Sequence, residues 1–204
     1  MLKDLVTDAR KTHHLGPEGR FELAEFEASW RKMGSNTNQP VTDDPKTAGL
    51  GLAKPNAFIL QQVAPGAGRI RIVGQQLQDI LAMEPRGMSF GGLFAESSRE
   101  NALELMDAAF TLPAIVSIPL IAPRGPLRRA IKAEVLLLPL WTPPRATKHL
   151  MGALVLDRPQ NIGRLEFSIS KYAPFRCDAL DHPVPDRRRS PSALKLVVNN
   201  KKAR

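Results

Sequence analysis

The chain has 204 residues, of which 43% are hydrophobic, 24% are charged and one is a cysteine. This length and composition provide enough apolar surface for a core, which argues against wholesale disorder, and one cysteine excludes a disulfide scaffold. The formal charge is +9, but residues 182–204 alone hold seven basic groups and one acidic group. The basic character therefore belongs mainly to the C-terminal segment.

The first predicted element is an amphipathic helix at residues 21–33. Its apolar side chains recur at spacings of 3, 4 and 3 residues, which places them on one helical face. They are Leu23, Phe26, Trp30 and Met33. This interaction helix has to bury its stripe, either on the protein's own sheet or against a second subunit. We expect a homodimer formed through this helix and the outer face of the sheet.

Two strands and a helix follow a polar linker. Residues 57–63 and 69–73 are expected to pair as an antiparallel hairpin, because the second segment alternates strictly and Gly66 lies in a turn sequence. The periodicity at residues 75–82 predicts a short helix. Short helical turns are expected at residues 88–95.

A capping box marks the clearest helix. Ser97 and Glu100 have the spacing at which each side chain satisfies the other's backbone amide at a helix start. Apolar residues then recur with helical periodicity as far as Phe110. We therefore predict a helix that begins at Ser97.

Three strand-like runs come next, at residues 115–122, 130–141 and 149–157. The last two are apolar on both faces, whereas a sheet with one solvated face would alternate. Something must therefore cover the second face, and the helix at residues 21–33 is the candidate. Residues 165–169 are a candidate for one more short strand.

The order of these elements resembles the PAS domain. The likeness is carried by RIRIVG at residues 69–74, by the helical stretch at residues 75–110 and by LLLPL at residues 136–140. Trp30-Arg31 and Asp44-Pro45 extend it, so that nearly the whole chain is similar to a family of short stand-alone bacterial PAS proteins.

The resemblance implies an α+β fold: a five-stranded antiparallel sheet with helices on one face and the N-terminal helix flanking it. We divide the chain into an N-terminal segment (1–19), a helix with its linker (20–56), a PAS-like domain (57–159) and a C-terminal extension with a basic tail (160–204).

The resemblance also implies a signalling or regulatory role. PAS domains bind small ligands between sheet and helices, or bind proteins through the outer face of the sheet and flanking helices. We expect a non-catalytic regulatory protein that acts through protein–protein contacts, and a small-molecule ligand stays an open alternative. The side chains expected to line a ligand cavity are Ile72, Leu77, Ile80, Phe90, Phe94, Met106, Val135 and Leu137. A close-packed core without a cavity is the competing interpretation.

The sequence predicts no cofactor and no enzyme activity. Flavin-type PAS photoreceptors use a cysteine in the stretch that corresponds to residues 87–99, and haem-type members use a histidine from the helix at residues 97–110; neither is present. The four histidines have no partners at zinc spacing. They are His13, His14, His149 and His182.

The basic tail offers an alternative function, which is binding of nucleic acid or another polyanion. Its contacts would come from Arg187, Arg188, Arg189, Lys201 and Lys202. The N-terminus lacks a signal-peptide pattern, and the longest uncharged stretch is shorter than the roughly 20 residues that span a bilayer. We therefore expect no membrane insertion and a cytoplasmic location.

Overall fold

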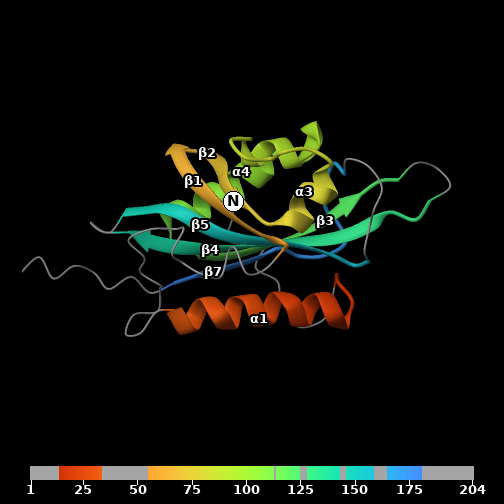
Figure 1. Ribbon diagram of the computed structural model, residues 1–204, viewed down its shortest axis with the longest axis horizontal. Coiled ribbons are helices and arrows are strands. Elements are labelled where there is room, and N and C mark those ends of the chain that lie inside the picture. The colour runs from red at the N-terminus through yellow and green to blue at the C-terminus, as the bar shows by residue number, and fades with distance from the viewer. Residues whose placement is uncertain are drawn as a thin grey trace, which may run out of the picture.

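A computed structural model describes residues 14–33, 55–112, 114–124, 128–142, 146–158 and 165–180. The chain forms three layers (Figure 1). An antiparallel sheet lies in the middle, helices α3 and α4 lie on one face, and helix α1 lies on the other. We call the face toward α3 and α4 the inner face and the face toward α1 the outer face.

The sheet contains the five strands expected from the sequence. They are β1 (Ala57–Ala64), β2 (Ala67–Val73), β3 (Ala114–Ala122), β4 (Ile131–Thr142) and β5 (Ala146–Leu156), in the order β2-β1-β5-β4-β3. Neighbouring strands are antiparallel in every pair. The predicted antiparallel α+β architecture is therefore confirmed.

Two short strands extend the sheet beyond the expected five. Strands β6 (Ser168–Ile169) and β7 (Arg176–Ala179) both pair with β3, at different points along its length. The sheet thus has seven strands, and it continues past residue 159, where the sequence analysis placed the end of the domain. Strand β6 lies within residues 165–169, the candidate for one more short strand. Strand β7 was not predicted, because four residues without clear alternation give no strong sequence signal.

The described helices match the predicted ones, with shifted ends. Helix α1 spans Pro17–Met33, and its proline suits a first helical turn, where an amide hydrogen has no helical partner. Helix α3 spans Gln75–Leu81, the 3-10 helix η1 spans Phe90–Leu93, and α4 spans Glu96–Thr111.

The predicted capping box is wrong. Helix α4 begins at Glu96, and its N-cap residue Ala95 has no side chain that could cap it. The nearby Ser98 has a different role, because its hydroxyl accepts a hydrogen bond of 3.1 Å from the backbone amide of Ile169 in β6. Ser98 therefore joins α4 to the added strand β6 and does not cap the start of the helix.

Two separate apolar layers hold the fold together. The inner cluster lies between the sheet and α3, η1 and α4, and the outer cluster lies between the sheet and α1. Strands β3 to β5 contribute side chains to both clusters, which explains why their sequences are apolar on both faces. The expectation that the N-terminal helix covers the second face is confirmed.

Candidate functional site

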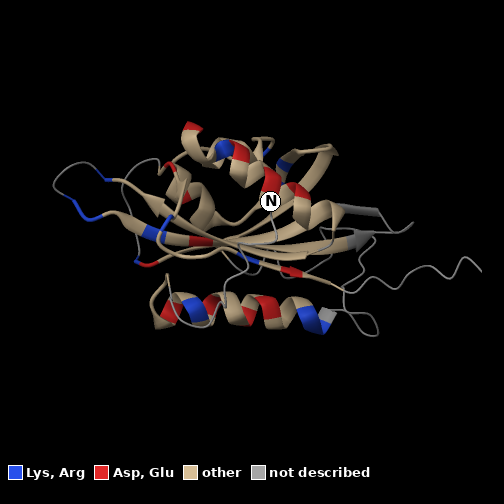
Figure 2. Cartoon of the chain, turned by 180° about the vertical axis from the view of Figure 1, so that it is seen from behind, with Lys and Arg blue, Asp and Glu red and all other residues tan. Residues whose placement is uncertain are grey.

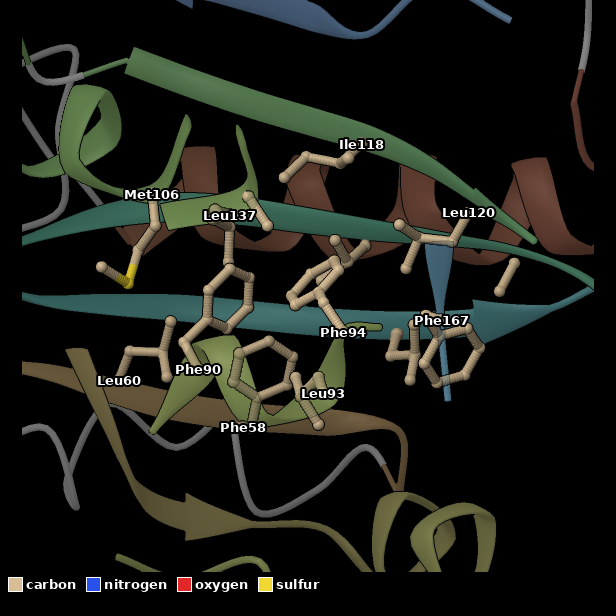
Figure 3. Packing of buried hydrophobic residues seen from close by; sticks show 14 of the residues in the cluster. Phe58, Leu60, Phe90, Leu93, Phe94, Met106, Ile118, Leu120, Leu137 and Phe167 are labelled. Atoms are coloured by element: carbon tan, nitrogen blue, oxygen red, sulfur yellow. The ribbon is translucent and has the colours of Figure 1, made fainter. Parts of the chain in front are cut away.

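The inner cluster contains seven of the eight side chains predicted to line a ligand cavity. Leu77, Ile80, Phe90, Phe94, Met106, Val135 and Leu137 are all buried there. Aromatic rings fill the middle of this layer: the centroids of Phe90 and Phe94 are 5.1 Å apart, and those of Phe58 and Phe90 are 6.5 Å apart (Figure 3). This is the geometry of ordinary aromatic packing.

Glycines allow this layer to pack closely. A Cβ atom at Gly152 would lie only 2.2 Å from the ring of Phe58, and one at Gly68 would lie 2.5 Å from the sulfur of Met106. Side chains therefore press directly against the backbone of the sheet. The arrangement favours the close-packed interpretation of these residues over a ligand cavity.

The prediction for the eighth residue, Ile72, is wrong, because its side chain lies on the outer face and not on the inner one. It packs against the outer cluster, whereas Ile70 belongs to the inner one. The reason is an irregularity in the hairpin, since Ile59 pairs with Ile72 but Leu60 pairs with Ile70. Such a bulge adds one residue to a strand, and it therefore reverses the alternation that the sequence predicted.

The outer face is covered by the protein's own helix. Leu23, Phe26 and Trp30 are buried against the sheet, and Trp30 has no exposed surface. The Trp30 indole Nε1 donates a hydrogen bond of 3.0 Å to the backbone carbonyl of Pro139 in β4. Of the two alternatives for the apolar stripe, the structure therefore shows packing on the same chain. The side chain of Met33 lies outside the described part.

The free side of α1 is charged. Figure 2 shows acidic and basic residues spaced along α1, whereas the strands that α1 covers carry few charges. Arg31 forms an ion pair with Glu27, which lies one turn earlier in α1. The Arg31 guanidinium also lies 5.7 Å from the centre of the Trp30 ring. Phe21 is the exception, because it is apolar and 67% exposed.

An ion-pair cluster joins α1 to the last strand. Arg176 in β7 donates hydrogen bonds of 2.6 and 3.2 Å to the two carboxylate oxygens of Glu27, and a third of 2.6 Å to Asp178. Burial alone would raise the pKa of Glu27, but the hydrogen bonds and charges of Arg176 and Arg31 outweigh it and hold that pKa below its ordinary value. This pairing is bidentate, which is the strongest geometry for arginine and carboxylate.

Beside this cluster a polar pocket opens between α1 and the sheet. Its volume is about 230 Å³. Its walls come from α1, from β3 and β4, and from the segment that leads into β7. Polar groups lining it are His14, Arg20, Glu27, Ser117, Glu134 and Arg176. We call it the outer pocket.

Sequence reasoning missed the outer pocket. Its lining residues lie far apart in the chain, and no motif connects them. A usable signal was present in Ser117 and Glu134, which are polar residues in strands that are otherwise apolar on both faces. The Ser117 hydroxyl donates a hydrogen bond to the Glu134 carboxylate across the two strands.

The remaining sequence candidates are the basic residues of the C-terminal segment. The basic residues Arg187, Arg188, Arg189, Lys201 and Lys202 lie outside the described residues. Cys177 is free, and burial together with the negative charge of Asp178 raises its pKa, which does not favour a reactive thiolate. The described residues include no cluster of histidine, cysteine and carboxylate groups suited to a metal ion.

The antiparallel sheet with its helices packed on the inner face is the architecture of a PAS-like sensor module. The family model for the PAS domain matches residues 21–155, and the chain therefore belongs to the PAS domain family. The match begins inside α1, so the family pattern includes the helix that covers the outer face. No curated protein matches the chain. Within the described residues, no helix is both long enough and apolar enough to cross a bilayer.

Proposed function

We propose that this protein is a non-catalytic PAS regulator that acts through protein–protein contacts, and that α1 controls access to the outer face of its sheet. Membership of the PAS family supports a sensory or regulatory role. The observation that carries the finer proposal is the burial of Trp30 against β4, because it places the chain's own helix where PAS domains commonly receive partners.

The packing of the inner layer supports partners over an internal ligand. Interlocked aromatic rings occupy the region between the sheet and the helices where PAS ligands lie. A ligand there would have to displace side chains such as Phe90. The packing free energy lost in this way would weaken ligand binding. In the outer layer, α1 is the only described helix that packs on the sheet. Its displacement would therefore disturb fewer packing contacts than displacement of the inner-layer helices.

Helix α1 has the properties of an exchangeable cover. Its contacts with the sheet form a cluster of their own, which shares no residue with the inner cluster. Residues 34–54 separate α1 from Pro55 in the sequence, so a single tight turn does not tie α1 to the sheet. A partner that presents a similar apolar helix face could replace α1, and so could α1 of a second copy, which would give a homodimer.

A disulfide between α1 and β5 tests this proposal. A Cβ atom placed on Gly19 would lie 3.2 Å from Cγ1 of Val155, so the two positions face each other at contact distance. A disulfide needs Cβ atoms about 3.5–4.5 Å apart, and a pair of facing positions this close is a suitable place to introduce one. We therefore suggest Gly19→Cys with Val155→Cys, in a Cys177→Ser background that leaves no third thiol. The reduced form of the same protein is the control.

We expect the oxidised form to lose association that the reduced form retains. Light scattering at high concentration would report self-association. Cross-linking of the purified oxidised or reduced protein in a cell extract, without added reductant for the oxidised form, followed by mass spectrometry, would report other proteins. Circular dichroism checks that both forms are folded. Equal association of the oxidised and reduced forms, with the same proteins and to the same extent, would contradict the proposal.

A further inference from the structure

We propose that the outer pocket is a binding site for a small zwitterion of the α-amino acid class, which would contact α1 and the sheet together. The site lies on the opposite face of the sheet from the aromatic inner layer. It exists only while α1 covers the sheet, because α1 forms one of its walls. Binding to this covered form does not require that α1 ever exchanges with a partner, so the two proposals can fail separately.

The first observation is a buried guanidinium nitrogen with no partner among the described residues. Arg20 of α1 lines the pocket, and its Nε atom is buried yet has no hydrogen-bond partner among the described residues. A buried polar atom left unsatisfied is costly, and a bound group that accepts its hydrogen bond removes that cost. Of the arginines with such an atom among the described residues, Arg20 alone lines the outer pocket. Because a guanidinium matches a carboxylate in shape and charge, a ligand carboxylate is the natural partner.

The second observation is a carboxylate in the opposite wall. Glu134 projects from β4 into the same pocket and accepts a hydrogen bond from Ser117. A carboxylate has about four acceptor positions, so this bond leaves capacity for further donors. A ligand ammonium group would use that capacity.

The charges of the lining select a zwitterion over an anion. Among the lining residues, Arg20 and Arg176 are cationic, and Glu27 and Glu134 are anionic. Arg176 and Glu27 already neutralise each other through their paired hydrogen bonds. In the part of the chain that the structure describes, the lining then leaves Arg20 as a cation with no ion pair and Glu134 as a carboxylate with acceptor capacity. This pair is the complement of a molecule that carries one carboxylate and one ammonium.

The shape of the site limits the size of the ligand. A volume of about 230 Å³ suits an amino acid and is smaller than most drug-sized sites, which begin at about 300 Å³. Apolar groups such as Leu23, Pro119 and Leu136 also line the pocket and can receive a side chain. Histidine 14 is held in place, since its Nε2 donates a hydrogen bond of 2.7 Å to the carbonyl of Leu120.

The test is a binding panel on the full chain. The twenty standard amino acids would be screened by thermal shift at millimolar concentration, and hits would be titrated by calorimetry. For each hit, the matching amine without the carboxylate, the N-acetyl derivative and inorganic phosphate serve as probes of the two charged groups. Circular dichroism confirms that each variant is folded.

We expect at least one amino acid to bind, and its decarboxylated and N-acetylated forms to bind at least about tenfold more weakly, because each loses one charged hydrogen-bonding group. Arg20→Gln and Glu134→Gln should each weaken binding by a similar factor. Matched controls are Arg86→Gln and Glu166→Gln, which remove the same charges from exposed positions outside the pocket. Both should bind as the unmodified protein does.

A direct readout follows the Arg20 side chain itself. In a nitrogen-15 spectrum, the bound amino acid should shift the Nε resonance of Arg20 and leave that of Arg86 in place. The proposal fails if no amino acid binds at millimolar concentration, if phosphate binds more tightly than every amino acid, or if Arg20→Gln binds as well as the unmodified protein.

Discussion

The inner and outer layers of this sheet differ in the way they are built. The inner layer is large, aromatic and apolar throughout, and it joins α3, η1 and α4 to the sheet. The outer layer has an apolar centre around Trp30, but at one end it becomes an ion-pair cluster and a polar pocket. We infer that the inner layer defines the fold, whereas the outer layer is the part that can respond to a ligand or partner.

The largest expected effect comes from the inner layer. Phe90→Ala removes a ring that has no exposed surface and that packs against both Phe58 and Phe94. We expect a loss of about 3–5 kcal/mol in the free energy of unfolding, measured with denaturant, because the cavity cannot collapse fully. Phe21→Ala on the exposed side of α1 is the control, with an expected change within about 0.5 kcal/mol. Equal losses from the two variants would contradict the assignment of the core.

A smaller and more local effect is expected from the outer layer. Trp30→Phe keeps an aromatic ring but leaves the Pro139 carbonyl without its indole donor, which costs about 1–3 kcal/mol. Hydrogen exchange should accelerate in α1 and change little in β4 and β5, since α1 can leave the sheet without opening it. If exchange in β4 accelerates as much as in α1, the two layers are a single cooperative unit.

The ion-pair cluster predicts a pH dependence. The folded pKa of Glu27 lies below its ordinary value of 4.5, so its carboxylate stabilises the fold above that value, and this contribution is lost as the pH falls through the lower, folded pKa. Glu27→Gln should therefore be less stable than the unmodified protein at pH 7, and the difference should shrink as the pH falls below 4.5.

Thermal melts from neutral pH to strongly acidic pH measure this difference. Glu166→Gln removes one carboxylate from an exposed position and controls for the change in net charge. A difference between Glu27→Gln and the unmodified protein that stays constant across the whole range would show that the ion pair contributes no pH-dependent stability.

The smallest expected effect on the fold comes from the basic tail. Deletion of residues 182–204 should leave the melting temperature unchanged within error, because a segment with seven basic groups and one acidic group has little apolar surface to bury. The alternative function predicts binding to nucleic acid that weakens steeply with salt and disappears with this deletion. Gel-shift titrations of the full chain and of the deletion variant test this alternative. Absence of nucleic-acid binding by the full chain at low salt would eliminate it.

The sequence predicted the layers well because periodicity reports which side chains are buried. The stripe at Leu23, Phe26 and Trp30 indicated a covering helix, and the double-sided apolar strands required one. The prediction failed at Ile72, because a bulge is not visible in the alternation of residues. It also failed at Ser97, because the helix begins one residue earlier, at Glu96, after an N-cap residue that has no capping side chain.

The outer pocket could not be predicted from the sequence, because its lining residues come from separate parts of the chain. Arg20, Ser117, Glu134 and Arg176 meet only because β3 lies next to β4 and β7, while α1 crosses the same face. Each residue on its own resembles an ordinary surface group. Only the fold reveals that the Nε atom of Arg20 is buried and has no hydrogen-bond partner among the described residues.

Native-state hydrogen exchange of the unmodified protein tests the central claim most directly. If α1 is an exchangeable cover, its amides should exchange at least about tenfold faster than those of β4, through an opening that leaves the sheet intact. The oxidised Gly19→Cys/Val155→Cys protein should remove that difference. Exchange of α1 and β4 at the same rate, with or without the disulfide, would contradict the account.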